Sequence, residues 1–170
     1  MKRRTLPYIM GALVALILAT GPVLAAVSAG QGTSGLPLPR FVSLRASEVN
    51  LRTGPGVQYP VEWVYVRKDL PVEVIAEFET WRKIRDWEGT QGWVHQSMLS
   101  GKRTVIIQGD VRLLRQKDDA KSKLVARLEP GVVARLMDCP NGNGWCQIEA
   151  DGYQGWLRHV DFWGAYKNEV

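Results

Sequence analysis

Histidine and cysteine, which supply many catalytic and metal-binding groups, are scarce in this sequence. The 170 residues include two of each, and the histidines, His95 and His159, stand far apart, each shortly after a Gly-Trp element. A catalytic site needs a convergent set of titratable groups. No glycine-rich phosphate loop and no motif around a nucleophile supplies an alternative. The sequence therefore predicts a protein that is not an enzyme and that has no cofactor or metal.

Charged residues are absent between Arg4 and Arg40. Three basic residues at 2–4 precede an apolar stretch over about 6–19. Two triplets that follow, at 23–25 and 27–29, fit the small-x-small pattern of a signal-peptide cleavage site. This order is typical of an export signal. We predict a signal peptide over residues 1–25, with cleavage after Ala29 as the alternative.

An uncleaved membrane anchor is the competing interpretation of this segment. Residues 8–29 are almost long enough to span a bilayer, but Gly21 and Pro22 in the middle argue against a continuous helix. We therefore expect a periplasmic or secreted protein, which contacts a membrane only if the segment is retained.

The excess of basic residues is small once the signal is removed. The chain has 22 Lys and Arg against 17 Asp and Glu, and three of the cations lie in the signal, which leaves 19 against 17. Basic and acidic residues are interleaved, as in "RKIRDWEG", which is the pattern of a solvated surface. A nucleic-acid partner would favour a basic patch, so we expect none.

The two cysteines, Cys139 and Cys146, flank the segment "PNGNGW". Its Asn-Gly turn signals predict a hairpin that brings the flanking strands together. In an oxidising compartment the expected outcome is a disulfide, and free buried thiols are the alternative. Two cysteines alone do not make a zinc site.

Residues 26–39 are small, rich in glycine, and end in "LPLPR". We expect a flexible leader here, with prolines that favour an extended chain. Residues 37–40 also look like a proline-rich ligand, so a binding groove of this protein could be occupied by its own leader.

The remainder of the sequence repeats itself. One unit starts with "VNLR" at 49–52 and closes with "GWVHQSML", and the other starts with "VRLL" at 111–114 and closes with "GWLRHVDF". Trp81 aligns with Trp145 at an offset of 64, and "QGWV" aligns with "QGWL" at an offset of 63. We predict two domains, over residues 40–101 and 102–170, joined by the short link "SGKR".

Apolar residues recur with a period of two inside each unit. We expect Val72, Val74 and Ala76 to share one face of a strand, and Cys146, Ile148 and Ala150 to share one face of another. No convincing helical period is present after residue 40. Each unit therefore reads as about five short strands in an all-β, barrel-like domain.

These motifs together resemble the bacterial SH3-like domain family, in the tandem form of exported bacterial proteins. The resemblance is carried by "VNLRTGPG", the strand "PVEVIAE", the tryptophan of "WRKIRD" and "QGWV". It implies two tandem small SH3-like barrels, the first with a long RT-type loop beside a groove. In the second unit "LRQKDDAKSK" replaces that loop without glycine, proline or an aromatic residue, so we expect a ligand site mainly in the first.

Candidate ligand-binding residues gather around the first loop. Trp81 lies on the strand face opposite Ile84, so its ring is at the surface if Ile84 fills the core, and packing between the domains is the alternative. Arg52 is suited to pair with a carboxylate, and Asn50 and Tyr59 flank the same loop. Turn capping by Asn50 and an ordinary surface position for Arg52 are the alternatives.

Packing is favoured for Trp93 and Trp156, because the glycine before each indicates a crowded strand. Taken together, the sequence predicts a non-catalytic exported binding module that recognises peptidoglycan or a cell-envelope protein. A structural protein-interaction module without glycan affinity is the first alternative, and an accessory of a cell-wall hydrolase is the second.

Overall fold

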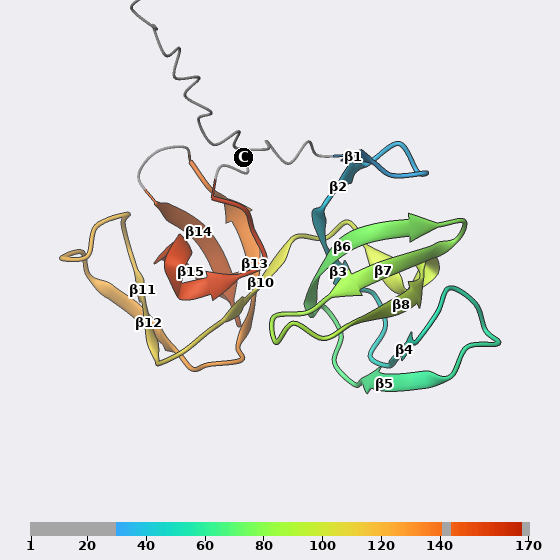
Figure 1. Ribbon diagram of the computed structural model, residues 1–170. Helices are drawn as coiled ribbons and strands as arrows, with labels where there is room; N and C mark the ends of the chain where they lie inside the picture. Colours follow the sequence, from blue (N-terminus) through green and yellow to red (C-terminus); the bar gives the residue numbers. More distant parts are fainter. Residues whose placement is uncertain (1–29, 141–143, 168–170) are drawn as a thin grey trace, which may run out of the picture.

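The structure consists of two strongly curved antiparallel sheets that lie side by side, one from each half of the chain (Figure 1). This computed structural model describes residues 30–140 and 144–167. The predicted export signal lies outside the described residues, as does most of the turn between the cysteines. Within the described ranges, none of the helices has the length and apolar character needed to cross a membrane.

The sheets have the same strand order, seven strands each in the described parts of the chain. The first follows β5-β4-β8-β7-β6-β3-β9 and the second β12-β11-β15-β14-β13-β10-β16. The first sheet is made of β3 (Arg40–Leu44), β4 (Val49–Arg52), β5 (Val61–Tyr65), β6 (Pro71–Phe78), β7 (Trp81–Arg85), β8 (Gln91–His95) and β9 (Leu99–Ser100). The second is made of β10 (Thr104–Ile107), β11 (Arg112–Arg115), β12 (Leu124–Leu128), β13 (Val133–Asp138), β14 (Trp145–Ala150), β15 (Tyr153–Arg158) and β16 (Phe162–Trp163).

A single turn of 3-10 helix precedes the last strand of each sheet, η1 (Gln96–Met98) and η2 (His159–Asp161). The predicted all-β tandem architecture is therefore confirmed, with more strands per domain than the five expected. The two sheets remain separate, and each domain has its own core cluster.

Each core lies on the concave face of its sheet, as the two-residue period predicts. On β14 the alternation holds, because Cys146, Ile148 and Ala150 are all buried. On β6 it does not hold to the end, because a β-bulge falls between Val74 and Ala76. The extra residue turns Ala76 away from the face of Val74, so the expectation that the two share a face is wrong.

The two domains match strand for strand, with the same irregularities. A bulge between Leu136 and Asp138 on β13 repeats that of β6. Arg52 pairs with Trp93 on β8, and Arg115 pairs with Trp156 on β15, which sets the offset at 63. The sequence element "VNLR" therefore corresponds to residues 112–115, one residue later than the predicted "VRLL".

A glycine allows the close pairing of β4 with β8 in the first domain and of β11 with β15 in the second. A Cβ atom on Gly92 would lie 2.9 Å from the Arg52 carbonyl oxygen, and one on Gly155 would lie 2.6 Å from the Arg115 carbonyl oxygen. Only a residue without a Cβ lets the two backbones approach so closely. The tryptophans that follow these glycines are half-buried, in keeping with the predicted packing role.

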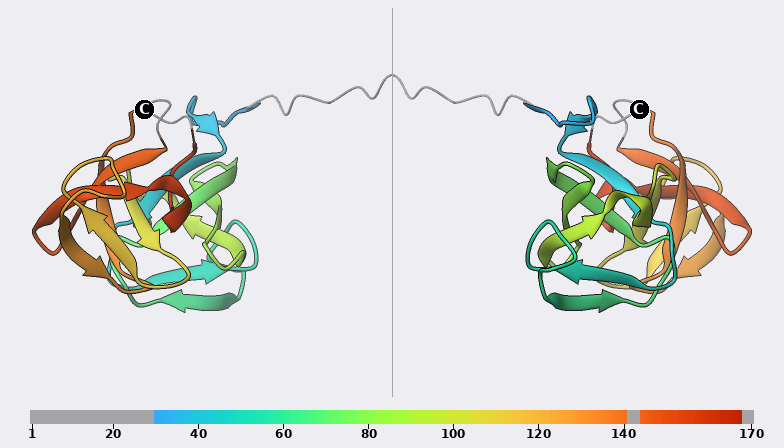
Figure 2. Two further views of the ribbon diagram at one scale, coloured as in Figure 1. Left: turned by 90° about the vertical axis from the view of Figure 1, so that its left-hand side faces the viewer. Right: turned by 90° about the vertical axis from the view of Figure 1, so that its right-hand side faces the viewer.

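Part of the expected flexible leader is folded onto the first domain. β1 (Gly30–Gln31) and β2 (Pro37–Leu38) pair as a hairpin, here called the leader hairpin, which projects beside β6 in both side views (Figure 2). Its turn binds Glu77 on β6. The Ser34 backbone amide and hydroxyl donate to the Glu77 carboxylate at 2.7 and 2.8 Å, and the Thr33 hydroxyl donates at 3.2 Å.

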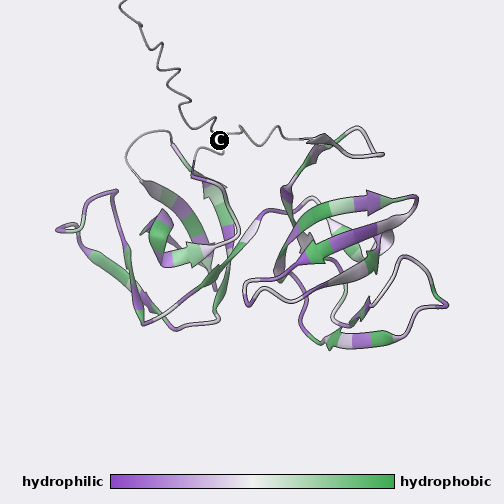
Figure 3. Ribbon diagram, in the orientation of Figure 1, coloured by the Kyte–Doolittle hydropathy of each residue, from purple (hydrophilic) through white to green (hydrophobic). Residues whose placement is uncertain are grey.

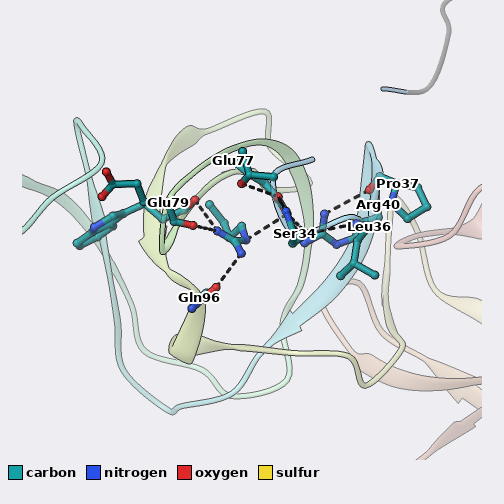
Figure 4. A network of polar contacts seen from close by, with 10 residues as sticks. Ser34, Leu36, Pro37, Arg40, Glu77, Glu79 and Gln96 are labelled. Carbon is teal, nitrogen blue, oxygen red and sulfur yellow. Dashed lines mark hydrogen bonds and ion pairs between the residues drawn. The ribbon is translucent and has the colours of Figure 1, made fainter. Parts of the chain in front are cut away.

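Two arginines complete the surroundings of Glu77 (Figure 4). Arg40 Nη2 lies 2.7 Å and Arg82 Nε 3.2 Å from the same carboxylate oxygen, and the Glu77 side chain is 0% exposed. Burial raises the pKa of this carboxyl, but the hydrogen bonds from Ser34 and the two guanidinium groups outweigh burial and lower it to about 2.

The second domain has a disulfide where the first has the pair Glu77 and Arg82. Cys139 and Cys146 are bonded, as predicted. Leu136 pairs with Ile148 as Val74 pairs with Ile84, which sets offsets of 62 and 64 on these strands. Cys139 and Cys146 therefore occupy the positions of Glu77 and Arg82. An ion pair and a covalent bond thus connect the same two strands in the two domains.

The domains meet through aromatic residues at the start of the first domain and near the end of the second. Phe41 contacts the Trp163 ring edge-on, with centroids 4.8 Å apart, and also contacts Tyr166. The Tyr166 hydroxyl donates to Glu73 at 2.7 Å, and Arg67 donates to the Gly131 carbonyl at 2.7 Å. Ile106 and Val133 of the second domain join the core cluster of the first.

The Glu77 network makes the stability of the first domain depend on acid. Because the folded pKa is lowered to about 2 from an ordinary value of 4.5, its contribution is complete above pH 4.5 and is lost as the pH falls towards 2. We expect Glu77→Gln to destabilise the domain by about 1–2 kcal/mol at neutral pH, to remove this part of the acid dependence, and to speed hydrogen exchange of the Ser34 amide.

The matched control is Glu79→Gln, because Glu79 is an exposed glutamate two residues away. Amide exchange measured by NMR at pH 7 and pH 3 separates the two variants. Equal exchange of the Ser34 amide in both would show that Glu77 does not hold the hairpin.

Candidate ligand grooves

Three of the four predicted ligand-binding residues line one groove in the first domain. Asn50 and Arg52 come from β4, and Trp81 comes from the start of β7. The groove has a volume of about 200 Å³, and we call it the Trp81 groove. Its lining consists of Glu48, Asn50, Arg52, Val57, Trp81, His95 and Met98.

Trp81 lies in this open groove and is half-buried. Its ring contacts His95 edge-on, with ring centroids 5.5 Å apart and planes at 80°. His95 Nδ1 lies 2.7 Å from the Ser97 hydroxyl and 3.3 Å from the Ser97 amide, so one side of the ring is held by Ser97. Of the two positions considered for Trp81, a surface groove and the domain interface, the structure has the groove, because the domains meet elsewhere, at Phe41 and Trp163.

Arg52 has a structural task in addition to its place in the groove. Its Nη1 donates to the carbonyl oxygens of Val57 at 3.2 Å and Tyr59 at 2.7 Å, so the guanidinium clasps the long loop between β4 and β5. Tyr59 is outside the lining of the groove. Its ring lies against the Gly54 backbone, where any side chain would collide with it.

A second groove lies at the equivalent place in the second domain, although the sequence favoured a ligand site mainly in the first. It has a volume of about 240 Å³, and we call it the Trp145 groove. Its lining consists of Val111, Arg112, Leu113, Arg115, Ala120, Trp145, Arg158 and Asp161. The Arg115 clasp is repeated too, because its Nη1 donates to the Ser122 carbonyl at 2.9 Å.

The sequence did not predict this groove, because the composition of the loop was taken as the sign of a ligand site. The loop in the second unit lacks glycine, proline and aromatic residues, but strands and the 3-10 turn supply most of the lining. The signal was present in the repeat itself, because the offsets of 63 and 64 place Arg115 and Trp145 over Arg52 and Trp81. His95 was also missed as a lining residue.

A third depression, of about 310 Å³, lies between the leader hairpin and β9. Its polar lining includes Ser34, Arg40, Arg82 and Gln96. Arg82 Nη2 donates to Gln96 Oε1 at 2.7 Å, and Arg82 Nη1 donates to the Glu79 and Trp81 carbonyls. Because these groups already bind one another, the depression holds few polar atoms for a ligand. The leader occupies this region and not the Trp81 groove.

The described residues contain no group of three or more His, Cys, Asp and Glu side chains that could hold a metal ion. The two histidines are in different domains and have separate partners. His159 Nε2 lies 3.0 Å from the Ala165 carbonyl oxygen, and His95 binds Ser97. Both cysteines are in the disulfide.

Comparison with known families gives one decisive match. The family model for the bacterial SH3 domain matches residues 45–101 and, separately, residues 109–164. The chain belongs to the bacterial SH3 domain family. Both matched ranges fall within the predicted domains. Bacterial SH3 domains are binding modules that often bind the cell wall, and they are typical of extracellular or cell-envelope proteins.

Other comparisons add little to the bacterial SH3 assignment. No curated protein sequence matches the chain. Among solved structures, NlpC2 from Trichomonas vaginalis is 11% identical, over 75% of this chain and 49% of that one, with a TM-score of 0.35. NlpC1 from the same organism is 12% identical, over 85% and 52%, with a TM-score of 0.34. The chain spans about half the length of each, and such weak likeness indicates neither activity nor ligand.

The arginine clasps of the two SH3 domains can be tested as a pair. We expect Arg52→Ala to speed amide hydrogen exchange in residues 53–60 by about fivefold to tenfold, because about one net hydrogen bond of stabilisation is lost. Arg115→Ala is the matched variant and should act on residues 116–122. Exchange measured by mass spectrometry reads both loops at once, and an unchanged loop in either variant would contradict the clasp there.

Proposed function

We propose that the protein is a non-catalytic binding module of the bacterial cell envelope that recognises peptidoglycan or an envelope protein through the Trp81 groove. The observation that carries the proposal is the convergence of Asn50, Arg52 and Trp81 on one open groove. The family also supports the proposal, because bacterial SH3 domains often bind the cell wall.

The chemistry of the groove suits an extended, polar chain. The Trp81 ring offers a flat contact surface with little side-chain entropy to lose. Around it, Glu48 and Asn50 provide acceptors, while Asn50, Arg52 and His95 provide donors. An open groove lined by an aromatic ring and several polar groups fits a sugar or peptide strand better than a compact apolar ligand.

Several observations support a binding role over catalysis. In the described residues the histidines are in different domains and the cysteines are bonded to each other. The Trp81 groove holds one carboxylate, that of Glu48, and no second carboxylate beside it. For these reasons we rank an accessory of a cell-wall hydrolase below a binding module.

Export completes the proposal. We infer that residues 1–25 direct the chain to the periplasm or outside the cell and that the mature protein begins near residue 26. The disulfide between Cys139 and Cys146 supports an oxidising compartment.

The second candidate is a protein-interaction module without glycan affinity, and β5 favours it. β5 is the outermost strand of the first sheet, and Val61, Trp63 and Val64 on it are 42%, 54% and 40% exposed. In Figure 3 the two ends of β5 carry hydrophobic colour, with a hydrophilic segment between them. An unpaired apolar edge is suited to pair with a strand from another protein.

Sedimentation of the purified protein with isolated cell walls tests the first candidate. We expect the wild type to sediment and Trp81→Ala to lose about tenfold or more in affinity, because it removes the central aromatic contact. Asn50→Ala should weaken binding less. Arg52 is unsuitable as a test because it also holds the loop.

Trp63→Ala is the matched control, since it removes a more exposed tryptophan from the same domain outside the groove. Loss of sedimentation in Trp63→Ala alone would favour the edge strand. A wild type that never sediments with walls would refute recognition of peptidoglycan.

A further inference from the structure

The Trp81 and Trp145 grooves share a frame but differ in charge. Both keep the clasping arginine and the tryptophan. The other positions differ: Glu48 corresponds to Val111, Asn50 to Leu113, Val57 to Ala120, His95 to Arg158 and Met98 to Asp161.

One further change adds a third guanidinium group to the Trp145 groove. Arg112 occupies the position of Val49, which is 1% exposed in the core of the first domain. Arg112 instead lines the groove, and its Nε donates to the Gln108 carbonyl at 3.1 Å. The Trp145 groove therefore has three guanidinium groups against one carboxylate, an excess of two positive charges. The Trp81 groove has one guanidinium group, that of Arg52, against one carboxylate, that of Glu48.

The single acid of the Trp145 groove fixes two of these arginines in place. Asp161 is 7% exposed, and its carboxylate lies 3.2 Å from Arg112 Nη1 and 3.4 Å from Arg158 Nε. The Arg115 guanidinium is fixed by the Ser122 carbonyl. Arginines that are already oriented lose less side-chain entropy when they bind a ligand.

We propose that the Trp145 groove is a binding site for an oxyanion, a carboxylate or phosphate group attached to an apolar or planar body. A planar guanidinium fork binds either group through two parallel hydrogen bonds. Trp145 and the half-exposed Val111 and Leu113 line the same groove and provide contact for the attached body. The site does not depend on recognition of the cell wall by the Trp81 groove.

NMR of the indole N–H signals in the ¹⁵N-labelled full-length protein can follow both grooves at once. Trp145→Phe and Trp81→Phe assign the two reporter signals. The probes are N-acetyl-alanyl-alanine with a free carboxylate, the same peptide with an amidated C-terminus, and inorganic phosphate. We expect the Trp145 indole signal to shift on addition of the carboxylate peptide, of phosphate or of both. The amidated peptide should leave its chemical shift unchanged. The two oxyanion arms distinguish the sources of the anion.

Arg158→Gln tests the role of the Arg158 guanidinium. Because the Arg158 side chain is 56% exposed, the fold should tolerate the change. We expect the dissociation constant for the oxyanion probe to rise about tenfold, the lower range for a charge-assisted hydrogen bond. Arg158→Lys should recover part of the loss, because it keeps the charge without the fork. Arg127→Gln removes the same charge at an exposed position of β12 and should leave binding unchanged.

Three results would overturn the proposal. The first is a Trp145 signal that moves with neither oxyanion. The second is an equal shift with the amidated peptide, and the third is equal weakening by Arg158→Gln and Arg127→Gln, which would mean diffuse charge attraction. None of these results depends on sedimentation with cell walls, so this proposal and the wall-binding proposal can fail separately.

Discussion

One buried carboxylate connects the leader hairpin and the start of β3 with the strands β6 and β7, more than 30 residues further along the chain. Glu77 binds the turn of the leader hairpin, Arg40 at the start of β3 and Arg82 on β7. A buried charge with a missing partner is costly, so these contacts depend on one another. The interaction explains why a glycine-rich leader is ordered without a core of its own. In the second domain, which has no leader to hold, the disulfide connects the same strands without a charge.

The two domains show which parts of this fold are constrained and which vary. The glycine at the strand crossing, the clasping arginine, the bulge and the groove tryptophan occur in both. The glycine, the arginine and the bulge set strand spacing and loop position, so a change in any of these three alters backbone geometry. The other groove-lining positions differ between the two domains and carry no such constraint on the backbone. The same frame can therefore present a nearly neutral groove in one domain and a cationic one in the other.

Sequence patterns predicted the parts of the structure that follow from local periodicity. The repeat predicted two domains, and the two-residue period predicted the shared buried face of Cys146, Ile148 and Ala150. Asn50 and Arg52 were predicted as ligand-binding residues from their place beside the first loop. The leader hairpin was missed because its ordering depends on Glu77, more than 40 residues away. The start of the second unit was misplaced by one residue because Val111 resembles Val49 in type, although Arg112 occupies the equivalent place. The second groove was missed because strand residues, and not the loop, make most of it.

The bulge on β6 shows why a one-residue irregularity matters beyond its own position. In a regular strand, Val72, Val74 and Ala76 would face the core and Glu77 would face outward. The bulge after Val74 reverses the alternation, so Glu77 lies opposite Arg82 on the same face as Ile84. The bulge after Leu136 has the same effect on Cys139, which then faces Cys146. Both connections between these strands require the bulge, whether the bond is ionic or covalent. The extra residue is thus the condition for the ion pair, and through it for the order of the leader.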